Sequence, residues 1–225
     1  MRARTLLRAL AATTALALVP ACAWAQATTI TPDIGPLRGL GTTVAQAGQM
    51  FTVDGGTLSG GNLFHSFSQF SLGQGATARW TQASGAAAVR NVINRVTGGQ
   101  TSQIAGTIDS TALPNASFFF INPAGVVFTP GAQVNVPGAA YFSTAAELRF
   151  VDGASFAVAT PGGSSLSMAA PESFGFVGGQ GGIDIQGAGQ GFASATTSLS
   201  FSGADVRLAR DNQALGDRLV VRGLD

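Results

Sequence analysis

The sequence has few of the residues that build most catalytic and metal sites. Its 225 residues include one histidine and one cysteine, and lysine is absent, so all 12 basic residues are arginine. Only 10% of the residues are charged, whereas roughly a quarter is usual in soluble domains. One histidine and at most one cysteine do not make up the usual ligand set of a zinc site. We therefore expect no metal and no cofactor.

Candidates for catalysis are equally sparse. The one histidine, His65, stands between Phe64 and Ser66 in an aromatic segment, which favours a structural or surface histidine. The 11 acidic residues are scattered singly along the chain. No two of them have the spacing expected of a glycosidase pair or a calcium loop. We therefore expect that the protein is not an enzyme.

Aromatic girdles and a basic excess are also missing. One tyrosine and two tryptophans are too few for the two aromatic girdles of a membrane-spanning barrel. Without its first 25 residues the chain keeps nine arginines and 11 acidic residues, a formal charge of −2. A nucleic-acid-binding protein usually has the opposite balance. We expect neither an integral membrane protein nor a nucleic-acid partner.

The first 25 residues have the pattern of a secretory signal peptide. A basic start and the apolar run Leu10–Val19 are followed by Ala-Trp-Ala at residues 23–25, a small-x-small cleavage site. The apolar run is too short to span a membrane. We expect cleavage before Gln26, which leaves a secreted chain without cysteine. The alternative, in which Cys22 becomes a lipid-modified N-terminus, fits the preceding residues poorly.

After residue 26, short clusters of Val, Ile and Phe alternate with Gly, Asn, Pro and Ser, and helical periodicity is scarce. This spacing predicts an all-β chain. Short strands without charges, and corners rich in residues that tolerate positive φ, favour a parallel β-helix over a sandwich or a barrel. The predicted strands are Met50–Val53, Ala78–Thr81, Val89–Ile93, Gln103–Ile108, Ser117–Ile121, Val126–Phe128, Gln133–Val136, Ala140–Ser143, Glu147–Phe150, Ser155–Val158, Phe174–Val177, Gly182–Gln186, Leu199–Phe201, Asp205–Leu208 and Leu219–Val221.

Two aromatic segments depart from simple alternation. Phe64, Phe67 and Phe70 recur at intervals of three, which fits either a turn of helix or a bent strand that caps a core. Residues 117–121, Ser-Phe-Phe-Phe-Ile, do not alternate in polarity, so both faces of that strand must be buried. We expect one face to fill the coil interior and the other to lie beneath an extra-helical element. Residues 122–125, Asn-Pro-Ala-Gly, then have the preferences of a type I β-turn.

Three blocks in register resemble the N-terminal secretion domain of filamentous-haemagglutinin-type exoproteins, the exported partner in two-partner secretion. Residues 60–72 (GGNLFHSFSQFSL) resemble its early aromatic segment, and residues 89–108 (VRNVINRVTGGQTSQIAGTI) resemble its Arg-Val-Thr-Gly-Gly block. Residues 115–136 (NASFFFINPAGVVFTPGAQVNV) resemble its apolar strand, its Asn-Pro-Asn-Gly-Ile turn and the Phe strand that follows. YFSTA (141–145) and PESFGFVG (171–178) continue the resemblance in order.

The resemblance implies a right-handed parallel β-helix over residues 26–225, with an N-terminal cap and extra-helical β elements. It also implies export through the periplasm of a Gram-negative bacterium by a cognate outer-membrane transporter, a barrel with periplasmic peptide-binding domains. The protein is then a secreted or cell-surface module of an adhesin or haemagglutinin that meets a host surface or other cells. Three alternatives stay open for the end at residue 225: a fragment, a truncated gene or a short exoprotein.

Six residues form the candidate motif, which serves either transporter recognition or structure. They are Asn122, Pro123, Gly125, Arg95, Gly98 and Gly99. The structural alternatives are a β-turn for the first three, a corner salt bridge or coil-end hydrogen bond for the arginine, and steric need for the two glycines. Ala124 departs from the family's second turn Asn, and Val126 from its common Ile. The alternative function is a free-standing β-helix that binds carbohydrate or a host surface through a lateral groove, or, less favoured, a polysaccharide-active enzyme.

Overall fold

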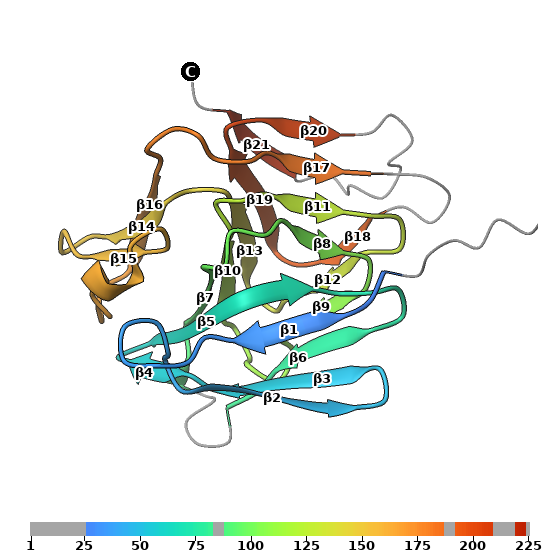
Figure 1. The fold of residues 1–225 in the computed structure, drawn as a ribbon, viewed down its shortest axis with the longest axis horizontal. Helices are drawn as coiled ribbons and strands as arrows, with labels where there is room; N and C mark the ends of the chain where they lie inside the picture. The colour runs from blue at the N-terminus through green and yellow to red at the C-terminus, as the bar shows by residue number, and fades with distance from the viewer. Residues whose placement is uncertain (1–25, 83–87, 187–191, 209–218, 224–225) are drawn as a thin grey trace, which may run out of the picture.

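Parallel strands wind into the successive coils of a β-helix in the computed structural model, which describes residues 26–82, 88–186, 192–208 and 219–223 (Figure 1). The predicted all-β class is confirmed. Each coil runs through three sheets, which we call A, C and B. Sheet A contains β5 (Asn62–Ser71), β7 (Asn91–Val96), β10 (Ser117–Ile121), β13 (Ala139–Ser143), β19 (Ser198–Gly203) and β21 (Leu219–Gly223).

Apart from β3, the strands of the other two sheets have only three or four residues. Sheet C contains β8 (Ser102–Ile104), β11 (Val126–Phe128), β17 (Ile183–Ile185) and β20 (Val206–Leu208). Sheet B contains β3 (Met50–Gly55), β6 (Thr77–Trp80), β9 (Thr107–Asp109), β12 (Gln133–Asn135) and β18 (Ala193–Ala195). Neighbouring coils are in register, so Phe118 aligns with Val92 of the coil before and Ala140 of the coil after.

Antiparallel strands cap the N-terminal end of the helix. β1 (Thr29–Pro32) and β4 (Thr57–Ser59) pair with β5, and β2 (Thr42–Ala47) pairs with β3. In Figure 1, β2 and β4 lie at the lower end of the helix, and β1 lies beside β5. The first coil is therefore closed by chain from its own N-terminal side, as the family resemblance implies.

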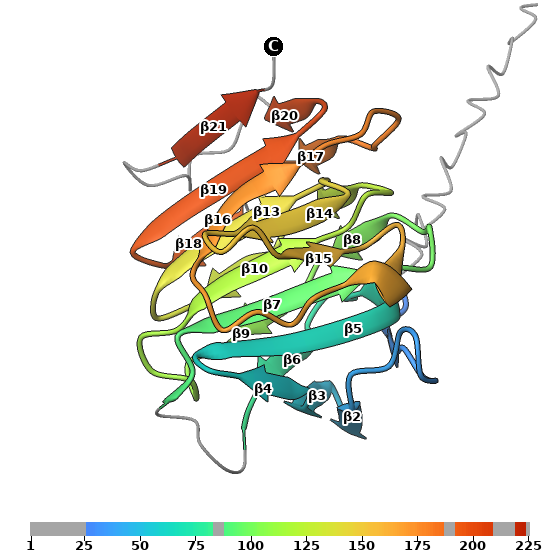
Figure 2. The ribbon, with the colours of Figure 1, turned by 90° about the vertical axis from the view of Figure 1, so that its left-hand side faces the viewer.

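A second antiparallel element leaves the helix between β13 and β17 and packs on the outer face of sheet A (Figure 2). Its strands are β14 (Glu147–Phe150), β15 (Ser155–Ala157) and β16 (Pro171–Gly175), with the 3-10 turn η2 (Pro161–Gly163) between the last two. β14 is the central strand, paired with β15 on one side and β16 on the other.

The extra-helical element explains why β10 does not alternate in polarity. Phe118 and Phe120 point into the helix and pack with other rings, such as Trp80 at 4.8 Å and Phe70 at 5.0 Å between centroids. Phe119 and Ile121 point outward into a second apolar cluster. That cluster is completed by the extra-helical side chains Leu148, Phe150, Phe156 and Val158. Both faces of the strand are buried, as the sequence predicts.

The aromatic segment around Phe67 is the ten-residue strand β5, so the helical alternative is wrong and the bent strand is confirmed. The pairing of β1 with β5 skips one residue between Phe67 and Gln69, which marks a β-bulge at Ser68. The extra residue shifts the alternation of the side chains by one position, so residue 70 points inward instead of residue 69. Phe67 and Phe70 therefore both pack in the helix interior, whereas Phe64 packs in the outer cluster.

Most predicted strands are shifted by one or two residues at an end, and three differ more. The strand predicted at Val89–Ile93 is β7 and begins at Asn91, and the strand predicted at Phe174–Val177 is β16 and ends at Gly175. The strand predicted at Gln103–Ile108 is two strands, β8 and β9, separated by a corner. A Cβ at Gly106 in this corner would lie 2.2 Å from the Ala76 carbonyl oxygen, so the chain turns there against the coil below.

We expect Phe142→Ala to lower the free energy of unfolding by about 3–5 kcal/mol, because a buried phenyl ring is removed from a packed interior. Its ring contacts four others, the nearest being Phe128 at 4.9 Å. Tyr141→Ala, on the outer face of the same strand and only half buried, is the matched control and should cost less. Urea unfolding measures both, and equal losses would contradict the packing described.

Candidate functional site

Asn122 begins a tight corner between β10 of sheet A and β11 of sheet C. Its side chain is fully buried. The amide Nδ2 donates to the Gln100 carbonyl and to Ser102 Oγ, both at 2.9 Å, and Oδ1 accepts from the Ala124 N–H at 3.0 Å. The Gly125 N–H donates to the Asn122 carbonyl at 3.0 Å, which closes the β-turn. The turn predicted from residue preferences is present.

The same corner holds both ends of the extra-helical excursion. Ser143, the last residue of β13, accepts a hydrogen bond from the Asn122 N–H at 2.9 Å. Where the chain returns, the Gly181 N–H donates to the Pro123 carbonyl at 2.8 Å. A Cβ at Gly181 would lie 2.4 Å from the Ala124 carbonyl oxygen, so this close stacking requires glycine. Residues 122–125 therefore position the departure and the return of residues 144–180.

Arg95 lies within β7 and not at a corner, which corrects the expectation of a corner salt bridge or a coil-end hydrogen bond. Its side chain is 1% exposed and points outward beneath the extra-helical element. Nε donates to Ser66 Oγ at 2.7 Å. Nη1 donates to the Ala157 carbonyl and Ser164 Oγ, both at 2.7 Å, and Nη2 donates to the Arg38 carbonyl at 3.2 Å. One guanidinium thus joins β5, the extra-helical element and the loop after β1.

The electrostatic environment of Arg95 is unusual for a cation. Its guanidinium carbon lies 4.5 Å from the ring centroid of Phe156. Burial lowers the pKa of Arg95 to about 10, an effect that the negative charge of Asp33 opposes. Ser66 connects the two groups, since its hydroxyl also donates to Asp33 Oδ2 at 2.7 Å. Arg95 therefore stays charged at neutral pH, held by carbonyl and hydroxyl oxygens.

Gly98 and Gly99 follow β7 at the corner below Asn122. A Cβ at Gly98 would lie 2.0 Å from the Ser68 carbonyl oxygen, so no other residue fits without moving the coil beneath. Gly99 has open space around it, but its φ of +73° is one that residues with a side chain rarely adopt. Steric contact therefore explains the glycine at position 98, and the positive φ explains the glycine at position 99.

Five of the six candidate residues gather on one edge of the helix. The two glycines lie in the corner of one coil, and Asn122, Pro123 and Gly125 lie in the corner stacked on it through the Gln100 carbonyl. Arg95 stands apart, because it points under the extra-helical element. The partners Ala157 and Ser164 were missed from the sequence, where a separation of 62 and 69 residues gives no local signal.

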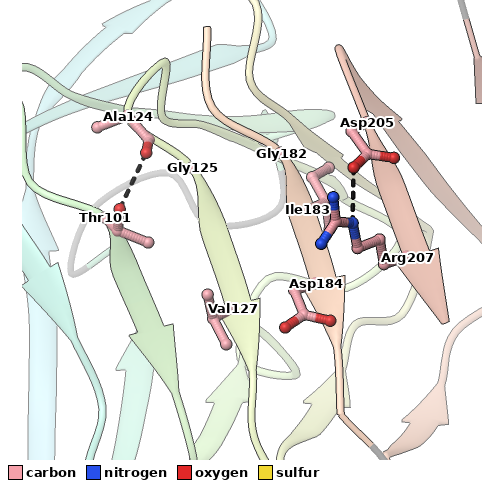
Figure 3. A pocket seen from close by; sticks show the side chains of 9 residues that line it. All are labelled: Thr101, Ala124, Gly125, Val127, Gly182, Ile183, Asp184, Asp205 and Arg207. Atoms are coloured by element: carbon pink, nitrogen blue, oxygen red, sulfur yellow. Dashed lines mark hydrogen bonds and ion pairs between the residues drawn. The ribbon is translucent and has the colours of Figure 1, made fainter. Parts of the chain in front are cut away.

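A shallow groove of about 290 Å³ lies beside the Asn122 corner, on the outer face of sheet C (Figure 3). Gly125 and Gly182 line it where neighbouring coils stack closely, since a Cβ at Gly125 would lie 3.1 Å from the Gly182 carbonyl oxygen. Arg207 in the groove is paired with Asp205 at 2.7 Å. Among the described residues, no group of three or more His, Cys, Asp or Glu side chains is placed to hold a metal ion.

No helix in the described ranges is long and apolar enough to cross a membrane. The family model of the TPS secretion domain matches residues 32–223. The chain belongs to the TPS secretion domain family. A TPS secretion domain targets a secreted exoprotein to an outer-membrane TPS transporter for export, and its role is targeting. No curated protein matches the chain.

We expect Arg95→Lys to lower the free energy of unfolding by about 2–3 kcal/mol, because an ammonium cannot replace the planar fork that serves four acceptors. The matched control is Arg79→Lys. Arg79 is 45% exposed in its side chain and pairs with Asp109 at 2.8 Å, so its replacement should cost less than about 1 kcal/mol. Urea unfolding distinguishes the two, and an equally mild effect at both positions would refute the role assigned to Arg95.

Proposed function

We propose that this TPS secretion domain directs an adhesin-type exoprotein to its cognate transporter while the chain is unfolded, and that folding then hides the recognised residues. Residues 1–25 serve as the leader that brings the chain to the periplasm. The transporter, a barrel with periplasmic peptide-binding domains, receives residues 26–225 as an extended chain. The folded domain is displayed at the cell surface.

The burial of Asn122 and Arg95 carries this proposal. Asn122 is fully buried and Arg95 is 1% exposed, and both are surrounded by groups from distant parts of the chain. A transporter cannot reach either side chain in the folded domain. If these residues belong to the recognised motif, recognition has to precede folding.

The order in which the contacts form gives export a direction. The corner at Asn122 exists only after residues 100–102 are in place, and it receives the excursion only after residues 181 and 182 follow. Coils of a solenoid interact with their neighbours, so they can fold one after another as the chain emerges. Each new coil buries apolar surface, which opposes backward movement of the chain.

The motif is tested by comparing secretion with stability. We expect Asn122→Ala with Pro123→Ala to reduce secretion by the matched transporter more than the loss of folding stability explains. The two substitutions remove the side chains that an extended chain would present to the transporter, and they also remove the turn. Secretion is measured as the fraction of chain in the medium, and stability as the urea midpoint of the refolded protein.

Gly181→Ala is the matched control, because it disturbs the same corner from the neighbouring coil and leaves residues 122–125 unchanged. At equal loss of stability, the control should be secreted better than the double variant. If secretion follows stability alone in both variants, residues 122–125 act only as a turn.

A further inference from the structure

The only histidine of the chain, His65, lies inside the first coil of the helix. Its side chain is fully buried on the inner face of β5 and stacks on Phe67, with ring centroids 6.3 Å apart. Nδ1 is 3.2 Å from Thr42 Oγ1, and Nε2 has no hydrogen-bond partner among the residues that the structure describes. The ring is therefore accommodated with one nitrogen unsatisfied.

The N-terminal cap closes directly over this ring. Thr42 belongs to the cap strand β2. The corner between β3 and β4 also touches the ring, since a Cβ at Gly56 would lie 2.8 Å from His65 Cε1. Protonation of the imidazole thus acts on the contact between the cap and the first coil.

The groups around His65 cannot satisfy a protonated ring. Thr42 Oγ1 already accepts a hydrogen bond from the Ser66 N–H at 3.2 Å. On β7, Asn94 accepts from Trp80 Nε1 and donates to the Phe119 carbonyl. An imidazolium would add a second N–H to this pocket, and a buried donor without an acceptor is costly.

The charged groups near His65 do not make protonation of its ring favourable. Asp54 on β3 favours the protonated ring, but desolvation is the larger effect and lowers the pKa of His65 to about 3. Asp33 and Arg95 belong to the outer side of sheet A, where both bind the Ser66 hydroxyl. The folded domain therefore holds His65 neutral.

We propose that His65 makes closure of the N-terminal cap sensitive to acid, so that a proton on the ring and a closed cap exclude each other. Protonation requires β2 and the Gly55–Gly56 corner to move off the ring. This inference deepens the proposed function and rests on it in one respect: if folding outside the cell drives export, an acidic medium weakens export at the first coil.

The direction of the pH dependence follows from the lowered pKa. A histidine titrates near 6.5 in an unfolded chain and near 3 in this fold. The stability associated with the neutral ring is fully present above pH 6.5 and is lost as the pH falls toward 3. Between pH 7.5 and pH 5.0, His65 should reduce the folding equilibrium constant roughly 30-fold.

Urea unfolding of the refolded chain at pH 7.5 and pH 5.0 tests the inference without any transporter. The wild type should lose roughly 30-fold more in folding constant than His65→Gln or His65→Phe over this interval. Amide exchange in β2, corrected for its intrinsic pH dependence, should rise in the wild type alone. An equal pH dependence in the wild type and in a folded variant would overturn the inference.

Proton NMR of the wild type gives a second test that needs no stable variant at position 65. The imidazole resonance of the folded protein should not titrate between pH 8 and pH 5. Gln69→His supplies the control, because residue 69 is exposed on the same strand and its histidine should titrate near 6.5. A His65 resonance that titrates near 6.5 in the folded state would refute the inference.

Secretion assays separate the inference from the proposed function. In cells with the transporter, export of the wild type should fall more than export of His65→Gln when the medium is shifted from pH 7.5 to pH 5.5. If the purified protein behaves as expected but both chains lose export equally, the coupling to export is wrong. If neither chain needs the transporter at pH 7.5, the proposed function fails, whatever His65 does.

Discussion

Sheet A is apolar on both faces, and most of the architecture follows from this constraint. Its inner face fills the helix, as any solenoid strand must. Its outer face carries Phe64, Ile93, Phe119 and Ile121, which would be exposed on a bare helix. The chain therefore leaves the helix between β13 and β17 to cover them with β14, β15 and β16 (Figure 2). The Asn122 corner holds the two ends of that excursion.

Burying the outer face also buries Arg95, and the protein compensates with hydrogen bonds instead of a direct carboxylate contact. A cation taken out of water needs several good acceptors. They come from β5, from the loop after β1 and from the extra-helical element, so three segments must be in place before the guanidinium is satisfied. The hydrogen bonds of Arg95 are therefore complete only in the folded domain. A transporter that recognises this region must bind it before the domain folds.

Local patterns predicted most of the fold, and distant contacts account for the rest. The non-alternating strand at 117–121 predicted burial on both faces, and the Asn-Pro-Ala-Gly preferences predicted the turn. The cap strands β1, β2 and β4 were missed, because they have few apolar residues and pair antiparallel outside the stacked coils. The split at Gly106 was missed because it depends on the coil beneath.

The candidate site likewise has a part that local sequence patterns predicted and a part that depends on distant contacts. Proline and glycine preferences identified the corner, since a turn is a local structure. The partners of Arg95 and the burial of His65 under the cap depend on residues brought together from far along the chain. No spacing rule in the sequence could place them. The structure shows that Asn122 and Arg95 are buried, so these two candidate recognition residues are accessible only before the domain folds.

Binding of the transporter's periplasmic domains to the refolded chain and to the urea-unfolded chain, freshly diluted, tests this order most directly. We expect binding during the interval before folding, and its loss as the tryptophan fluorescence of Trp80 reaches the folded value. Tight binding to the fully folded domain, with no loss over time, would contradict it.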